Sequence, residues 1–135
     1  MGAWGIGTFE NDDAADWLDE LQASADSSVL QTALEGTEND EEYLEAPEGI
    51  HILCAGEIIA ALQGQSAPDL PDEARDWVQE HKSLDVSPLI PIATRKIDRV
   101  LDNGSGLREL WQENEADYPA WSESVSSLKA RLSLT

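Results

Sequence analysis

Three carboxylates near the start of the chain have a spacing that could hold a cation. Asp12, Asp16 and Glu20 recur at i, i+4 and i+8, so a helix over these residues carries all three on one side. Carboxylate oxygens are the ligands that Ca²⁺ and Mg²⁺ prefer. A cation is normally wrapped by ligands from several directions, however, and one helix side supplies only one direction. We therefore predict a solvated helix face and no metal site, with a binding role for these carboxylates as the alternative.

A second group of reactive side chains lies near the middle of the chain. His51, Cys54 and Glu57 follow one another at i, i+3 and i+6, and these residue types could ligate zinc or form a cysteine–histidine nucleophile. Zinc needs further ligands, and His81 is the only other histidine. A reactive thiol needs an exposed, electropositive setting, whereas Cys54 shares its predicted helix face with isoleucine and leucine. We therefore predict a core cysteine, a partly exposed His51, no catalytic residue and no cofactor.

Glu57 is a carboxylate inside the most apolar segment of the chain. Burying a carboxylate is costly unless it is paired or hydrogen-bonded, so the sequence predicts a partner for it. The candidate partners are Arg75, Arg95, Arg99, Arg108 and the N–H groups of the N-terminal arm. A buried pair that fixes the fold is the first interpretation, and a functional carboxylate in a cleft is the second.

Negative charge is concentrated in the first half of the sequence. The net charge is −20, yet residues 1–74 contain no lysine or arginine, and all eight basic residues follow. A field of one sign repels nucleic acids and anionic membranes and speeds encounter with a basic protein. The first interpretation of this charge is a solvated acidic surface, adapted to high salt in one form. A salt-adapted surface would carry its acid everywhere, so the asymmetry gives weight to the alternative, a surface that binds a basic protein.

The single cysteine and the hydropathy pattern indicate where the protein acts. Cys54 has no partner for an internal disulfide, which is typical of a reducing compartment. The N-terminus lacks the basic and apolar regions of a signal peptide. The longest apolar stretch, residues 50–62, is too short to span a bilayer. We therefore expect a cytoplasmic protein without membrane contact.

The elements that would position these side chains are predicted from apolar spacing and from cap residues. Helices are expected from Asn11–Asp13 to about 21, over 27–35, from Pro47 to about 63, from Pro71 to about 81, from about 89 to 102, from Ser105 to about 111, and from about Pro119 to 132. The stretch IHIL at 50–53 could instead form a strand. Residues 1–10 form a glycine-rich apolar arm. The result is one all-α domain over 1–135, a compact globule of six or seven short amphipathic helices. Its expected structural residues are Trp4, Phe9, Trp17, Cys54, Trp77, Trp111 and Trp121.

Several stretches of the chain resemble a known family. The opening MGAWGIGTFENDDAADWLDEL at 1–21 is the most specific, and it is followed in order by YLEAPE at 43–48, AGEIIAAL at 55–62, LPDEARDWV at 70–78 and LRELW at 107–111. Together they resemble the bacterial family known as domain of unknown function 4259. The resemblance implies one intact domain and assigns no activity, substrate or catalytic residue.

Two function classes follow from these observations. The first is a non-enzymatic, acidic protein-interaction domain that binds a basic partner, of which an immunity- or antitoxin-like inhibitor is one form. The second is a small enzyme or metal-dependent binding protein that uses carboxylates near Glu57 and Asp12/Asp16, with a polar cleft where the N-terminal arm meets the third helix. The sequence does not determine the partner, the pathway or the oligomeric state.

Overall fold

The computed structural model describes residues 8–9, 11–35, 43–68, 70–102 and 104–133. Within these ranges the chain is helical and forms no strand, which confirms the predicted all-α class. The stretch IHIL is part of a helix. The elements are α1 Asp12–Gln22, α2 Ser28–Glu35, α3 Ala46–Leu62, α4 Asp72–Glu80, the 3₁₀ helix η1 Ser87–Leu89, α5 Ile90–Leu101, α6 Gly106–Gln112 and α7 Tyr118–Ser133. The predicted glycine-rich arm of residues 1–7, with Trp4, lies outside the described residues.

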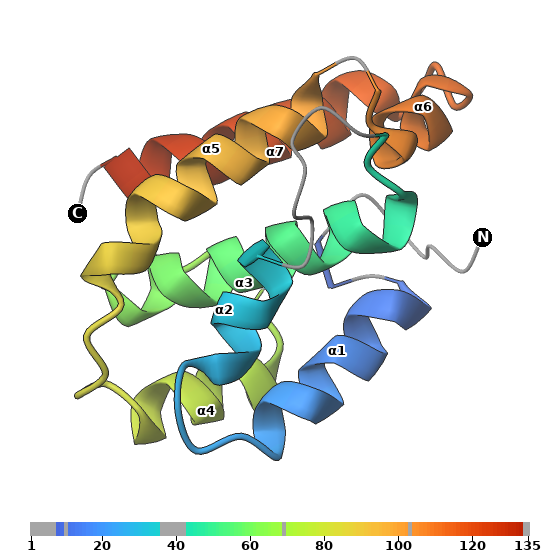
Figure 1. The fold of residues 1–135 in the computed structure, drawn as a ribbon. Helices are drawn as coiled ribbons and strands as arrows, with labels where there is room; N and C mark the ends of the chain where they lie inside the picture. Colours follow the sequence, from blue (N-terminus) through green and yellow to red (C-terminus); the bar gives the residue numbers. More distant parts are fainter. Residues whose placement is uncertain (1–7, 10, 36–42, 69, 103, 134–135) are drawn as a thin grey trace.

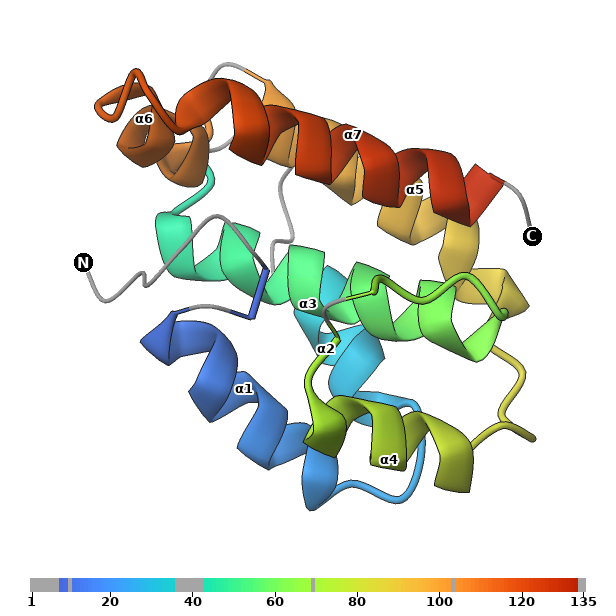
Figure 2. The ribbon, with the colours of Figure 1, turned by 180° about the vertical axis from the view of Figure 1, so that it is seen from behind.

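Helix α3 is the centre of the molecule. From Gly49 to Ala61 every residue except His51 is buried, because the apolar side chains of this helix point in all directions. It contacts all six other α-helices. In Figures 1 and 2, α5 and α7 lie side by side along one side of α3, and α1 and α4 lie along the opposite side. We call these pairs the α5/α7 layer and the α1/α4 layer.

Local sequence signals fix where the helices begin. The side chain of Asn11 accepts a hydrogen bond of 2.8 Å from the Ala14 backbone N–H, and the Ser105 hydroxyl accepts one of 3.3 Å from Arg108. Such side chains satisfy N–H groups that have no partner inside the helix. Glu45 precedes α3 and forms a capping box with Glu48. Three predicted helix starts are therefore explained by their cap residues.

Two short contacts hold the start of α3 against α6. Leu44 donates to the Gly104 carbonyl at 2.8 Å and accepts from the Gly106 N–H at 2.7 Å. The space around Gly106 is tight, since a Cβ there would lie 3.0 Å from the backbone nitrogen of Ala46. A side chain at this position would therefore push the two segments apart.

The aromatic residues predicted to be structural lie where the helices meet. Trp17, Trp77, Trp111 and Trp121 are buried, and Phe9 is half-buried against the core. Trp111 and Trp121 stack with ring centroids 6.1 Å apart, which joins α6 to α7. Among the described residues, no helix combines the length and the apolarity that a membrane crossing requires.

Candidate functional site

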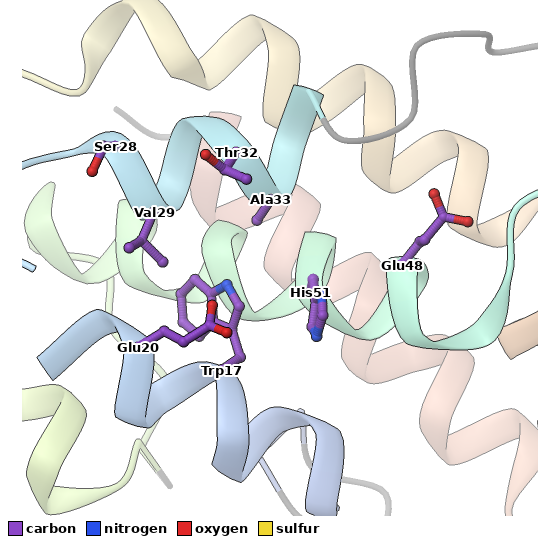
Figure 3. Close-up of a pocket in the computed structure, with 8 residues that line it drawn as sticks. All are labelled: Trp17, Glu20, Ser28, Val29, Thr32, Ala33, Glu48 and His51. Atoms are coloured by element: carbon purple, nitrogen blue, oxygen red, sulfur yellow. The ribbon is translucent and has the colours of Figure 1, made fainter. Parts of the chain in front are cut away.

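The candidate site is a cavity of about 370 Å³ between α1, α2 and the first half of α3 (Figure 3). Helices α1 and α2 contribute polar and apolar side chains to it, and α3 contributes polar side chains alone. The lining residues are Trp17 and Glu20 from α1, Ser28, Val29, Thr32 and Ala33 from α2, and Glu48 and His51 from α3. We call it the α1–α2–α3 cavity.

Trp17 forms a wall of this cavity and has an unused hydrogen-bond donor. Its side chain is almost completely buried, with the residue only 3 % exposed. Its indole N–H makes no hydrogen bond in the described part of the chain, although Trp77 donates its own to the Ser24 carbonyl at 3.0 Å. Figure 3 shows the Trp17 ring extending from α1 toward α2. In the described chain no side-chain nitrogen or oxygen that is sealed from solvent lacks a partner, so this N–H opens to the cavity, where it is suited to an acceptor that enters.

Two carboxylates lie at the rim of the cavity and differ in their bonding. Glu48 accepts a hydrogen bond of 3.3 Å from the Glu45 backbone N–H, which completes the capping box of α3. Glu20 is exposed beside Trp17, and within the described ranges it has no ion-pair or hydrogen-bond partner for its side chain. No lysine or arginine precedes residue 75. The cavity therefore has an uncompensated negative charge at one end.

The outer surface of α1 and α4 continues this negative charge. The exposed carboxylates of these two helices, which we call the acidic face, are Asp12, Asp16, Asp19, Glu20, Asp72, Glu73, Asp76 and Glu80. Asp19 and Glu73 lie together at a second cavity, of about 350 Å³, on the α4 side of α1. Arg75, the only basic residue of α1 and α4, donates to the Leu70 carbonyl at 3.1 Å. The sequence-predicted residues Asp12, Asp16 and Glu20 are thus all exposed on α1.

Glu57 lies elsewhere, on the side of α3 that faces α7. It is 4 % exposed, and Arg131 donates to its two oxygens at 2.8 and 3.1 Å and to the Gln65 carbonyl at 3.1 Å. A bidentate, charge-assisted pair of hydrogen bonds of this kind satisfies a buried carboxylate. The predicted buried pair is present, but its partner is Arg131, which the sequence analysis did not name. The reason is tertiary: Arg131 is 74 positions away and belongs to the last helix.

The Glu57–Arg131 pair also lines a cavity of about 200 Å³. The other lining residues are Thr8, Phe9, Ala67, Pro68, Leu70, Pro71, Ser124 and Ser127. This is the place where the chain before α1 meets α3, and a polar cleft was expected there. Glu57 does not lie in the α1–α2–α3 cavity with Glu20, so the structure does not bring these two predicted carboxylates into one site.

Cys54 and His51 occupy different environments. Cys54 is fully buried, and burial, followed by the charges of Glu57 and Asp13, raises the pKa of its thiol well above the ordinary value. A thiol in this state is protonated and unreactive. His51 is half-buried in the wall of the α1–α2–α3 cavity. Among the described residues, no group of three His, Cys, Asp or Glu side chains could hold a metal ion.

Two contributions to these sites were not among the residues predicted from the sequence. No sequence pattern marks Ser28 and Thr32 of α2 as cavity residues. The sequence gives a weak signal for Arg131, because this residue follows Leu128 by three positions and precedes Leu132, at the edge of the buried stripe of α7. A basic residue at the edge of an apolar stripe is a reasonable partner for a buried acid.

A family model described as Domain of unknown function (DUF4259) matches residues 2–124. No curated protein and no solved structure matches the chain.

Proposed function

The chain belongs to the family Domain of unknown function (DUF4259), and from its geometry we propose that it is a non-enzymatic binding protein whose acidic face engages a basic protein. The functional unit is the single domain of residues 1–135. We also propose a bacterial cytoplasmic setting, which the resemblance of residues 1–21 and the lone thiol support.

The observation that carries this proposal is the separation of charge between the two layers. Helices α1 and α4 carry nine carboxylates and one arginine, whereas α5 and α7 carry five basic residues and two carboxylates. The five basic residues are Arg95, Lys96, Arg99, Lys129 and Arg131. A surface that gathers charge of one sign creates a field that attracts and orients an oppositely charged partner.

The local geometry supports a docking surface rather than scattered solubilising charge. Carboxylates line cavities on both sides of α1, with Glu20 on the α2 side and Asp19 on the α4 side. Like charges on one helix face destabilise it by a few tenths of a kcal/mol per pair. Their accumulation on α1 costs the free protein stability, and a cationic surface bound there would offset this cost.

The test compares two variants that lose the same charge from different surfaces. The face variant is Asp16→Asn/Asp19→Asn/Glu20→Gln, and the matched control is Glu113→Gln/Glu115→Gln/Glu123→Gln, with all six positions exposed. The native chain and both variants are immobilised and exposed to lysate at low salt. A retained basic protein is then purified, and its dissociation constant is measured with each of the three chains.

We expect the face variant to bind about tenfold more weakly, because each of three exposed ion pairs contributes up to about 1 kcal/mol. The control variant should bind as the native chain does, and added salt should weaken native binding. Retention of no basic protein at low salt, or equal weakening by both variants, contradicts the proposal.

A further inference from the structure

We propose that the α1–α2–α3 cavity binds one basic residue of the partner, with its side-chain cation beside Glu20 and its backbone carbonyl accepting the Trp17 indole N–H. This inference rests on the proposed function and specifies the chemistry of its central contact. It commits to a lysine or arginine within a protein chain, and not to a free small cation.

The unused donor of Trp17 is the first observation behind it. The residue is 3 % exposed, lines the cavity and has no hydrogen-bond partner for its indole N–H in the described chain. Because this N–H opens to the cavity, it can donate to an uncharged or anionic acceptor that enters there. A backbone carbonyl is such an acceptor, and every peptide residue carries one.

The charge at the rim is the second observation, and it is independent of the first. Glu20 lies next to the Trp17 ring in Figure 3, and Glu48 lies at the opposite end of the cavity. The three helices that form the cavity contain no lysine or arginine. An anion is therefore excluded from the Glu20 end, whereas an ammonium or guanidinium group fits there.

The size of the cavity and the chemistry of its remaining wall also fit a basic residue. A volume of about 370 Å³ falls in the range of pockets that hold small ligands. Val29 and Ala33 supply apolar surface for the aliphatic stem of a long basic side chain. Ser28 and Thr32 supply hydroxyls that can donate or accept. A basic residue presents an aliphatic stem, a cation and a carbonyl, which are the three features that this wall matches.

The test uses the full chain and short capped peptides as probes. The peptides are Gly-X-Gly with X as arginine, lysine or citrulline, the last being a neutral analogue of arginine. N-Methylguanidinium serves as the free cation. Binding is followed by the amide and indole resonances in ¹H–¹⁵N NMR, which detects weak complexes, and the Trp17 indole peak is assigned with Trp17→Phe. Each probe is also titrated into Glu20→Gln and Asp19→Asn, two exposed charge removals on adjacent positions of α1.

We expect the arginine and lysine peptides to move the Trp17 indole peak downfield, as a new hydrogen bond does, and the citrulline peptide and N-methylguanidinium to leave it in place. Glu20→Gln should weaken peptide binding about threefold, which is the size of an exposed ion pair. Asp19→Asn should not, because Asp19 lines the cavity on the other side of α1.

Three outcomes would overturn this inference: no movement of the Trp17 peak with either basic peptide, an equal response to citrulline, or equal weakening by Asp19→Asn and Glu20→Gln. If the acidic-face variant still loses the basic partner in any of these cases, the proposed function stands and only the role of the cavity fails. Conversely, peptide binding at Trp17 combined with equal partner binding by the face and control variants would support the cavity and contradict the proposed function.

Discussion

The α1/α4 layer and the α5/α7 layer pack on opposite sides of α3, yet they differ in whether their charged side chains have ion-pair partners. On the α7 side, the buried carboxylate of α3 is held by Arg131, and Asp98 of α5 pairs with Lys129 of α7. On the α1 side, Arg75 is the only basic residue of the two helices that carry the acidic face. Two basic residues of the α5/α7 layer are thus paired with carboxylates, whereas the carboxylates of the acidic face are exposed to solvent.

This difference separates two uses of a carboxylate. Glu57 is buried and contributes to the arrangement of α3 and α7, because an unpaired charge in that position would be very costly. Glu20 is exposed, contributes little to stability and is available to a ligand. The physical distinction is burial: the fold must satisfy a buried charge, whereas an exposed charge can be reserved for a partner.

Breaking the paired layer should have the largest effect. Arg131→Met leaves Glu57 buried without its partner, and we expect the free energy of unfolding to fall by about 3 kcal/mol or more. Urea unfolding followed by tryptophan fluorescence measures this change. The matched control is Lys129→Met, which removes the exposed pair with Asp98 and should cost less than about 1 kcal/mol.

A double variant separates the pair from general packing. In Glu57→Gln/Arg131→Met the buried charge is gone, so much of the lost stability should return. If Arg131→Met and Lys129→Met cost the same, or if the double variant is no more stable than Arg131→Met, the Glu57–Arg131 pair does not have the structural role assigned to it here.

The same difference explains how much the sequence could predict. Helix positions follow from local signals, such as Asn11 as a cap and the apolar run of α3, and these predictions agree with the structure. Burial of Glu57 and Cys54 also follows from the helix period. The partner of Glu57 does not, because pairing across 74 positions depends on how α7 packs against α3, which no local pattern encodes.

The candidate site was predictable only in part. Glu20 and the acidic surface of α1 follow from spacing and composition alone. The cavity does not, because it lies between α1, α2 and α3, and the contributions of Ser28 and Thr32 depend on how these helices pack. Trp17 was predicted as a core residue and is one. That its indole N–H has no hydrogen-bond partner in the described chain could not be predicted, because this depends on where the folded chain positions its acceptors.

Cys54 lies in the central helix α3, and two carboxylates affect its thiol, Glu57 of α3 and Asp13 of α1. Burial, Glu57 and Asp13 raise the pKa of its thiol, so the folded chain keeps this proton at pH values where the unfolded chain loses it. Stability from this group is therefore complete below the ordinary thiol pKa and is lost as pH rises above it, by about 1.4 kcal/mol per pH unit. Urea unfolding at a series of pH values above 8 measures this slope.

The control for the thiol is Cys54→Ala. This variant should be less stable overall because it leaves a cavity, but its stability should decline less steeply with pH than that of the native chain. Other groups titrate in the same range, including Tyr43, whose pKa the hydrogen bond to Glu109 raises. Only the difference between the two slopes therefore reports on Cys54, and identical slopes would show that the thiol ionises equally in both states.

The smallest expected effects come from replacing one exposed aspartate by lysine in each layer. They distinguish the layers directly, because the same substitution should change the free energy of unfolding in opposite directions. Asp16→Lys places a cation between Asp12 and Glu20 at i−4 and i+4, and it should raise the free energy of unfolding by about 0.5 kcal/mol. Asp98→Lys removes the pair with Lys129 and adds a like charge beside it, so it should lower the free energy of unfolding by a similar amount, about 0.5 kcal/mol. Both positions are exposed, and both changes should shrink as salt screens the charges. If both substitutions change the free energy of unfolding in the same direction, the two layers do not differ in charge balance, and the acidic face is not distinguished from the rest of the surface by unpaired negative charge.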